Sequence, residues 1–598
     1  MPDNLEHKLR HIPLLKHFSN YFDAQERRLV LRSIIIGVVV WAIVYSLKVS
    51  VHWLFDELIL PRVESSASLF VILLPLVLGA LLMMLFVKHG TSTIHYRDNT
   101  GHIHPLVDVE GDGLERAIAL YYTSEPTLEQ ALLGKEGVDV RWELPTFSLA
   151  LRKFGATLAT LGSGGSGGLE ASVTLIGESV SAGLFKPRRT ISRAKETLEP
   201  VNWVWRWWQS TDPDDLQTAQ LGGIAAAVST LLGAPFAAAF FATEVMYRRR
   251  PLISKLVYSL IPSLIAFFLS EIVGHGPPSV FHVAERIVPP NTLVYYLSVV
   301  LMAFIISLVA LSFRRLRDVA SHGFRRFMPH LWMRHVAGAL LTGLIALAVV
   351  YLTGHEYGLD LVLGTGEAGI DAALLGELSW KVAMLALVGK MLATLATIES
   401  GGSAGLLVPS VFFGTMVAAG MADMLGQFPP MALIVPAMTA SLVSIVNVPL
   451  AAILFAVEVF GASYMVPALI ALVAASILAH EGTIYRSQRE RVERRQILPG
   501  YGVRRFIVPP HWDGRTLIEM DVRKRFGLNV IGVVEQRTQN GRLQQQVRLE
   551  PPSSQPMHRG DVMVVLGEEA KLDAFEADLQ ERDGSGQEFS DARFADAE

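Results

Sequence analysis

Long apolar runs, separated by short polar segments, fill the chain as far as Ala479. A helix needs about 20 mostly apolar residues to cross the hydrocarbon core of a bilayer. The runs 405–425 and 430–460 contain interior Pro or Gly, so we expect short, tilted or broken helices there. The pattern predicts an all-α polytopic membrane protein with apolar segments at residues 29–54, 69–87, 219–246, 252–273, 292–313, 335–352, 380–398, 405–425, 430–460 and 465–479.

Basic residues gather in the polar segments that flank these runs. Residues 1–28 form a basic amphipathic pattern without a cleavage signal, which predicts a helix at the cytoplasmic face. The basic clusters at residues 186–193, 314–326 and 486–495 are expected on the same side, because positive charge favours cytoplasmic loops. This places both termini inside, in a bacterial-type inner (plasma) membrane. The polar segment before residue 141 contains one predicted short helix, residues 114–122.

The composition changes sharply after residue 487, where the membrane region (29–487) ends. Residues 488–500 read as a linker, and residues 501–582 as a small cytoplasmic α+β domain. In it we expect a helix over 516–525, strands over 528–535 and 562–566, and a last helix over 568–579. The acidic tail, residues 583–598, is predicted to be disordered.

The membrane region contains a diverged internal duplication. KFGATLATLGSGGSGG, starting at Lys153, recurs as KMLATLATIESGGSAG, starting 237 residues later at Lys390. A second shared block, APFAAAFFATEV and VPLAAILFAVEV, contains Glu244 in its first copy and Glu458 in its second. Two blocks in the same order indicate two repeat halves, about 29–275 and 290–487.

Each first block is an apolar helix that breaks into Gly and Ser and then resumes. Inside a bilayer, such a break leaves unpaired N–H groups at the start of the next helix, where the helix dipole favours negative charge. Two repeats with broken helices that meet near the midplane are a common plan in transport proteins. The pattern predicts a membrane anion site built from backbone amides. The alternative is that these small residues only allow close helix packing.

Composition narrows the possible functions. The chain of 598 residues is 51% hydrophobic and 18% charged, with a mean hydropathy of +0.37 and a net charge of −4. Nothing in this balance suggests nucleic-acid binding, and the absence of Cys excludes disulfides and thiolate chemistry. The sequence shows no metal-ligand spacing, no nucleophile–base pair and no P-loop. We therefore expect that the protein is not an enzyme and uses no cofactor.

The duplicated blocks and the segments that follow them resemble the CLC family of chloride channels and proton/chloride antiporters. The resemblance covers roughly residues 1–487 and implies a homodimer with inverted-topology repeats and an anion pathway in each subunit. The segment GGLEAS sits where the family has G-[KR]-E-G-P, so by resemblance Glu170 gates the pathway and Leu169, Glu170 and Ala171 form the outer anion site. The alternative for Glu170 is a surface glutamate at a helix start.

Two further signatures complete the site that the resemblance implies. Leu406, Leu407 and Val408 sit where the family has G-x-F-x-P, whose backbone amides coordinate the anion. Tyr485 falls where the family has a tyrosine whose hydroxyl contacts the central anion. The alternative for it is an interfacial tyrosine. For the family's G-S-G-I-P, the nearest stretch is GHIHP, which puts His102 in place of the anion-binding serine.

One position bears on mechanism. The antiporters of the family carry a second glutamate directly after the residue that matches Glu244, and here that position is Val245. By resemblance this favours a voltage- or pH-gated channel for a small monovalent anion, chloride before others. A proton-coupled antiporter, for chloride, bicarbonate or nitrate, remains open if His102, Glu178 or Glu244 carries the proton. A ligand sensor anchored in the membrane is the alternative from another class.

The soluble domain resembles the C-terminal regulatory domain (RCK_C, TrkA-C type) of potassium-conductance regulators. The residues that carry this resemblance lie in GRTL at 514, LNVIGVV at 528 and RGDV at 559. The resemblance implies dimerisation and a small-molecule ligand.

Overall fold

The computed structural model describes most of the chain in two compact units. In the helical unit it describes residues 24–90, 93–97, 103–107, 109–122, 144–185, 213–246, 253–274, 281, 287–478, 483–485 and 488. In the smaller α+β unit it describes residues 501–539, 542–559, 561–568 and parts of 571–579. The predictions for residues 1–23, 486–487, 489–500 and 583–598 lie outside the described residues.

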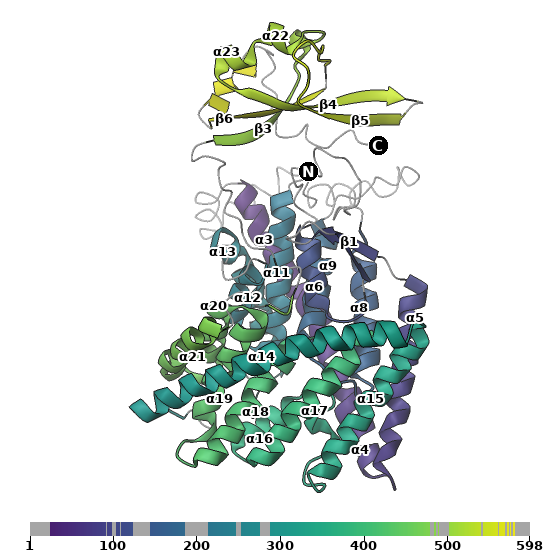
Figure 1. Ribbon diagram of the computed structural model, residues 1–598, viewed down its shortest axis with the longest axis vertical. Helices are drawn as coiled ribbons and strands as arrows, with labels where there is room; N and C mark the ends of the chain where they lie inside the picture. The colour runs from purple at the N-terminus through teal and green to yellow at the C-terminus, as the bar shows by residue number, and fades with distance from the viewer. Residues whose placement is uncertain are drawn as a thin grey trace, which may run out of the picture. The chain divides into compact units, whose positions relative to one another are not determined.

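In the first half of the helical unit, long helices such as α3 and α13 alternate with shorter ones such as α6 and α12 (Figure 1). The Pro residues at the start of α11 and α12 lack an N–H and fit the first turn of a helix. The predicted helix 114–122 is confirmed as α6. The elements are α3 (Ala24–His52), η1 (Trp53–Ile59), α4 (Leu60–Glu64), η2 (Leu69–Ile72), α5 (Leu73–Gly90), the hairpin β1 (Thr93–Arg97) and β2 (Ile103–Val107), α6 (Gly113–Tyr122), α8 (Phe147–Leu161), α9 (Glu170–Phe185), α11 (Pro213–Leu232), α12 (Pro235–Glu244) and α13 (Ile253–Gly274).

The second half repeats this alternation of long and short helices. The apolar run 430–460 is divided among α19, η4 and α20, as expected, and α20 begins at Pro449. Pro436 lies inside α19, and the run 405–425 forms the single continuous helix α18, so no break was needed there. The elements are α14 (Leu293–Phe327), α15 (Leu331–Leu352), η3 (Leu359–Leu361), α16 (Glu367–Leu375), α17 (Trp380–Glu399), α18 (Leu407–Leu425), α19 (Pro430–Ser441), η4 (Leu442–Val446), α20 (Pro449–Phe460), η5 (Ala462–Tyr464) and α21 (Met465–Leu478).

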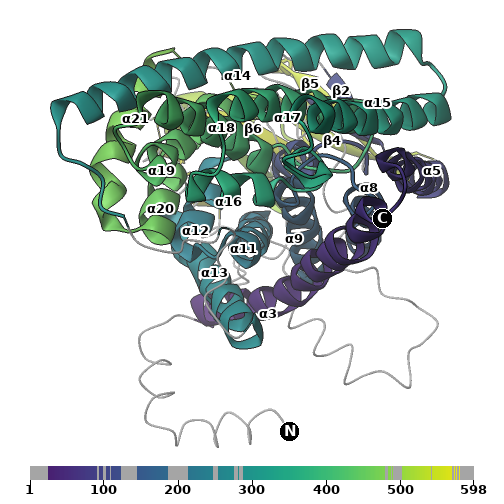
Figure 2. The same ribbon diagram turned by 90° about the horizontal axis from the view of Figure 1, so that it is seen from below.

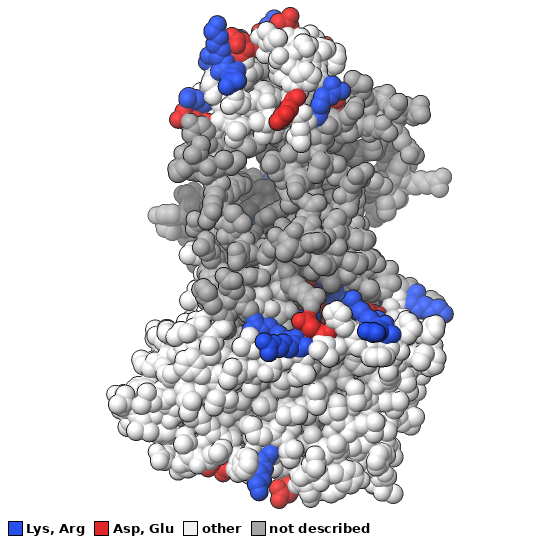
Figure 3. All heavy atoms as spheres, in the orientation of Figure 1, with Lys and Arg blue, Asp and Glu red and all other residues white. Residues whose placement is uncertain are grey.

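The surface of the helical unit fits a lipid environment. Among the described residues, seven helices are long and apolar enough to span a membrane. Large apolar side chains are exposed along them, including Leu74, Leu78 and Leu85 on α5. Figure 3 shows a broad belt without charged residues on the visible face of this unit, with Lys, Arg, Asp and Glu along its edges. The predicted polytopic helical membrane fold is confirmed.

Helix α14 corrects one prediction. The sequence analysis ended this helix at residue 313 and assigned residues 314–326 to a connection, whereas the helix continues to Phe327. Arg and Leu are good helix formers, so the basic cluster extends the helix instead of ending it. Figure 2 shows α14 along one edge of the helical unit, with α3 and α13 along the opposite edge. The extension carries Arg317 to the ends of α6 and α17, where it pairs with Glu115 (3.4 Å) and Glu399 (2.9 Å).

Two glycines bring α9 and α11 into close contact in the first half. A Cβ atom added to Gly177 would collide with the backbone oxygen of Gly223, and one added to Gly223 would collide with that of Gly177. Both helices are almost fully buried along this contact. The small residues therefore serve close packing here, as expected for membrane helices.

The smaller unit contains a four-stranded antiparallel sheet in the order β3-β6-β4-β5. The predicted helix over 516–525 forms with a capping box between Thr516 and Glu519, but it is interrupted at Asp521, which has a positive φ of 49°. The core of the smaller unit contains the buried side chains of Val533, Met563 and Phe575. Its elements are β3 (Tyr501–Ile507), η6 (Pro510–Trp512), α22 (Leu517–Met520), α23 (Val522–Phe526), β4 (Asn529–Gln539), β5 (Arg542–Leu549) and β6 (Val562–Glu568).

Candidate anion site

The two helix breaks of the duplication meet inside the helical unit. The N–H of Gly168 donates to the carbonyl of Gly405 (2.8 Å), and the N–H of Gly405 donates to the carbonyl of Gly168 (2.6 Å). These glycines lie two residues before the starts of α9 and α18, so the amino ends of both helices lie side by side. The turns before them are alike, since Gly164 and Gly401 have φ values of 101° and 109°. Only Gly adopts this conformation readily.

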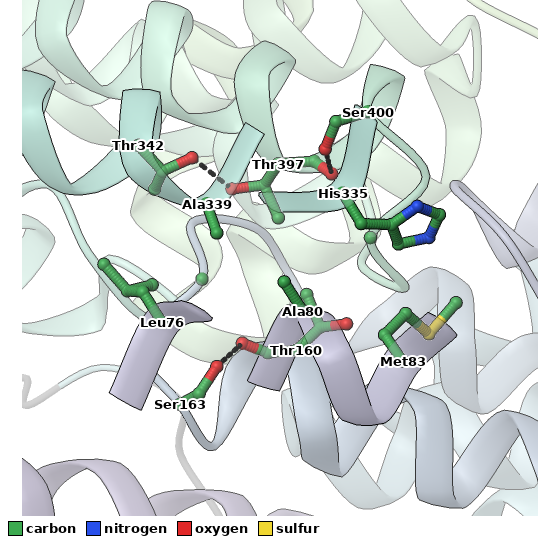
Figure 4. Close-up of a pocket in the computed structure, with 12 residues that line it drawn as sticks. Leu76, Ala80, Met83, Thr160, Ser163, His335, Ala339, Thr342, Thr397 and Ser400 are labelled. Atoms are coloured by element: carbon green, nitrogen blue, oxygen red, sulfur yellow. Dashed lines mark hydrogen bonds between the residues drawn. The ribbon is translucent and has the colours of Figure 1, made fainter. Parts of the chain in front are cut away.

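Hydroxyl groups join the two breaks across the repeats. The N–H of Ser166 donates to Thr397 Oγ1 (3.1 Å), and the N–H of Ser403 donates to Thr160 Oγ1 (3.0 Å). These two bonds are related by the 237-residue repeat. Figure 4 shows Thr160 and Thr397 on opposite walls of a small cavity, together with Ser163, Ser400 and His335. The polar groups of the breaks are thus largely satisfied by one another.

A buried lysine supports the approach to each break. Lys153 Nζ donates to the carbonyls of Val109 (3.3 Å) and Gly111 (2.9 Å), which precede α6. Its counterpart Lys390 donates in the same way to Val362 and Gly364, which precede α16. Each lysine therefore fixes the loop that leads to a short helix of its own half.

Glu170 is the first residue of α9 and is 3% exposed, which excludes the alternative of a surface glutamate. Its carboxylate folds back over Gly168 and lies beside the ring of Pro409, with the amide of Val408 among its nearest backbone donors. Oε2 has no hydrogen-bond partner. A buried carboxylate oxygen without a partner is costly for folding, so Glu170 is a candidate for a functional position.

The remaining predicted residues lie close to this junction. Leu169 and Ala171 flank Glu170 and are buried, and Leu407 and Val408 begin α18 and are buried as well. Tyr485 is 0% exposed, so it is not an interfacial tyrosine. The segment before it is held in place because Arg317 Nη1 donates to the carbonyl of Ile484 (2.6 Å).

Asp112 is the residue that the sequence analysis missed. Its Oδ2 accepts a hydrogen bond from the N–H of Leu406 (3.1 Å) and one from the hydroxyl of Tyr485 (3.5 Å). Its Oδ1 accepts from the N–H of Leu114 (2.8 Å), at the start of α6. His102, the residue that the sequence analysis placed beside Tyr485, lies outside the described residues. The residue found beside Leu406 and Tyr485 is an aspartate.

A signal for Asp112 is present in the sequence. VEGDG, ending at Gly113, recurs as VLGTG, ending at Gly366, 253 residues later. The first Gly of each copy has nearly the same φ, 63° at Gly111 and 62° at Gly364. Comparing the two halves with this second offset would have placed Asp112 opposite Thr365, directly before a short helix.

The residue after Glu244, where the resemblance places the second glutamate of the antiporters, is the apolar Val245. Val245 is buried, and its carbonyl accepts from Gln488 Nε2 (3.0 Å). Glu244 caps α20 through the N–H groups of Leu450 (3.2 Å) and Ala451 (3.0 Å). Its counterpart Glu458 caps α12 in the same way. This reciprocity agrees with a structural role for Glu244.

Glu178, the other candidate carrier, lies on α9 two turns after Glu170. Its carboxylate accepts from Gln220 on α11 (2.6 Å) and from Ser179 (2.8 Å). These bonds hold the carboxylate at the contact between α9 and α11.

The fold and the site define a class: polytopic helical membrane proteins in which two inverted repeats bring broken-helix amino ends together. A family profile described as voltage gated chloride channel matches residues 123–480, more than half of the chain. The chain belongs to this family, the CLC family of anion transport proteins.

Two curated relatives were compared by sequence. A chloride/fluoride channel protein of Pseudomonas syringae pv. tomato is 27% identical over 283 residues, which are 46% of this chain and 59% of that protein. An uncharacterized protein of Methanocaldococcus jannaschii is 24% identical over 270 residues, which are 44% of this chain and 63% of that protein. The matches thus span less than two thirds of the length of either relative.

Solved structures show the same fold. A slow cyanobacterial Cl⁻/H⁺ antiporter aligns with 76% of this chain and 94% of its own, with a TM-score of 0.56 and 17% identity. A CLC-type fluoride/proton antiporter aligns with 78% of this chain and 100% of its own, with a TM-score of 0.56 and 20% identity.

Proposed function

We propose that this chain passes a small monovalent anion, chloride before others, through the junction of α9 and α18, with Glu170 as its gate. The observation that carries the proposal is the reciprocal bonding of Gly168 and Gly405, which brings two helix amino ends together under a buried carboxylate with a free oxygen. Helix amino ends favour negative charge, so the same place suits an anion or the carboxylate. Displacing the carboxylate would open the place to the anion.

Passive conduction is our first candidate for the transport mode. The buried Val245 offers no titratable group beside Glu244, and Glu244 itself caps α20. A relative is described as a chloride/fluoride channel protein. The second candidate is coupled anion/proton exchange. This exchange is favoured by Asp112, because its titratable carboxylate accepts hydrogen bonds from the N–H of Leu406 and from the hydroxyl of Tyr485.

The experiment is anion efflux from vesicles that contain the purified full chain, wild type or Glu170→Gln. We expect the wild type to release chloride faster than empty vesicles. At neutral pH, Glu170→Gln should raise the efflux by roughly tenfold, equivalent to about 1.4 kcal/mol off the barrier. Glu178→Gln is the matched control, because it neutralises a second buried glutamate of α9 that is fully hydrogen bonded.

The outcomes separate the proposals. If neither the wild type nor Glu170→Gln releases anions above the background, for chloride, fluoride, nitrate or bicarbonate, the transport function is wrong. If the two variants Glu170→Gln and Glu178→Gln behave alike, Glu170 is not the gate. Proton uptake driven by an anion gradient would replace the channel by the antiporter.

The predictions for assembly and regulation extend this proposal. We propose that the chain works as a homodimer with both termini in the cytoplasm, and that the α+β unit binds a small regulatory ligand. The support is the family for the first and the predicted resemblance of residues 501–582 for the second.

A further inference from the structure

The Asp112 carboxylate accepts hydrogen bonds from two donors that the family resemblance assigns to the anion. One is the N–H of Leu406, at the amino end of α18, and the other is the hydroxyl of Tyr485. All three residues are buried, and Asp112 is 4% exposed. An N–H group that donates its hydrogen to a carboxylate cannot donate it to an anion as well. The carboxylate therefore stands where the anion would bind.

The backbone keeps Asp112 in this place. Gly111 before it has a φ of 63°, and the Gly111 carbonyl is bound to Lys153. A Cβ atom on Gly113, the residue after it, would collide with the carbonyl oxygen of Ala171 at the start of α9. The Asp112 carbonyl accepts from Arg116 Nη1 (2.9 Å). The side chain is thus presented to the junction by a fixed loop and can leave it only by rotation.

The charged groups around Asp112 come from five elements. Glu115 and Arg116 belong to α6, Lys153 to α8, Glu170 to α9, Arg317 to α14 and Glu399 to α17. Arg317 is paired with Glu115 and Glu399, and Lys153 is bound to carbonyl groups. Asp112 and Glu170 are thus two buried carboxylates near each other, and their negative charges repel.

We propose that Asp112 is a second gate of the pathway: its ionised carboxylate occupies the Leu406 amide and the Tyr485 hydroxyl, and an anion binds there only after Asp112 takes up a proton. This inference rests on the proposed function. The proton comes from water and forms an O–H bond on Asp112. The anion then accepts a hydrogen bond from the Leu406 N–H. When the anion leaves and the Asp112 carboxyl ionises again, the proton returns to water.

The competing explanation is an ordinary helix cap. Asp112 Oδ1 accepts the Leu114 N–H at the start of α6, as N-cap residues do. Asn and Ser cap helices about as well as Asp, so substitutions to Asn and Ser retain the cap. They remove the charge together with the Oδ2 acceptor that meets the Leu406 N–H and the Tyr485 hydroxyl. They therefore test the gate without removing the fold's local support.

The experiment compares anion efflux at about pH 4, near the ordinary pKa of Asp and Glu side chains, with efflux at about pH 8. The variants are the wild type, Glu170→Gln, Asp112→Asn and the double variant, each as the full chain in vesicles. We expect the ratio of the two effluxes to be largest for the wild type, smaller for each single variant, and close to one for the double variant. Asp112→Asn alone should raise efflux at the higher pH by roughly tenfold. Thr365→Ser, at the repeat counterpart of Asp112, should retain the wild-type ratio.

A binding measurement gives a second readout. Chloride affinity, measured by titration calorimetry of the detergent-purified protein, should rise with falling pH in Glu170→Gln and be independent of pH in the double variant. If Asp112→Asn does not purify as a folded protein, Asp112→Ser takes its place in both measurements.

Each result has one meaning. The second gate is overturned if Asp112→Asn and Asp112→Ser keep the wild-type ratio and the double variant keeps that of Glu170→Gln, since Asp112 is then only a cap. It is also overturned if these variants abolish a flux of K⁺ or Na⁺ that the wild type carries, because the two carboxylates then hold a cation. If no variant moves any anion, the proposed function fails, whereas pH-independent anion flux in the wild type removes only the second gate.

Discussion

The two repeat halves share their supports and differ in the charged residues that they carry at corresponding positions. Lys153 and Lys390 bind corresponding carbonyl groups, and Glu244 and Glu458 cap each other's helices. At the junction this symmetry ends. The first half has Asp112 and Glu170, where the second half has Thr365 and Leu407.

The difference divides the work between the halves. Both carboxylates come from the first half, and each meets one backbone N–H from the start of α18 in the second, that of Leu406 for Asp112 and that of Val408 for Glu170. Positions that hold the breaks together stay alike, because a change in one copy would leave buried polar groups unpaired. Positions that lose this likeness are therefore candidates for function.

The lysine pair gives the largest expected effect on stability. Lys153→Met and Lys390→Met each leave two or more buried carbonyls without a donor, which should lower the free energy of unfolding by about 3 kcal/mol each. The measurement is unfolding in mixed micelles with increasing SDS. Lys381→Met is the control, because Lys381 is exposed. A loss in only one of the two variants would show that the halves are not equivalent supports.

The sequence predicted these supports better than it predicted the site. Both copies of the break are visible in the order of Gly and Ser, and their meeting followed from the cost of unpaired backbone groups in lipid. The division of the run 430–460 was read from its interior Pro residues, and Glu170 was singled out by the family resemblance. Asp112 was missed because its contact with Leu406 joins residues 294 positions apart. Asp112 and its repeat counterpart Thr365 are also 253 residues apart, whereas the two copies of the break are 237 residues apart. Helix α14 was predicted to end at residue 313 because the basic cluster 314–326 was taken as a polar connection, whereas the helix continues to Phe327.

The glutamate pair should have a smaller effect. Glu244→Gln and Glu458→Gln each weaken two charge-assisted hydrogen bonds at a helix amino end, at a cost of about 2 kcal/mol. Glu244 is fully buried and Glu458 is half-buried, so the loss should be the larger for Glu244. The same unfolding assay checks the order.

Efflux across the pH range provides the control for this pair. If both glutamates are only caps, neither variant should change the ratio of efflux at acidic and neutral pH. A Glu244→Gln variant that loses proton movement while Glu458→Gln keeps it would make Glu244 a proton carrier and end the symmetry at this position.

The smallest effect distinguishes two hydroxyl pairs that the repeat makes almost identical. Thr157 Oγ1 bonds to Ser403 Oγ (2.9 Å), and its counterpart Thr394 Oγ1 bonds to Ser166 Oγ (3.1 Å). Ser166 also donates to the carbonyl of Val362 (2.8 Å), which leaves it a partner after Thr394→Val. Thr157→Val should therefore lower the free energy of unfolding by about 1 kcal/mol, and Thr394→Val by less.

The double variant Thr157→Val with Ser403→Ala isolates the cause of this difference. Removing both hydroxyls leaves no buried group without a partner, so the double variant should cost no more than Thr157→Val alone, since an unmet polar group is costlier than an absent one. Equal losses for Thr157→Val and Thr394→Val would mean that the Val362 carbonyl does not hold Ser166. In that case the likeness of the halves would extend further into the junction than these contacts suggest, and only Asp112 and Glu170 would set the first half apart.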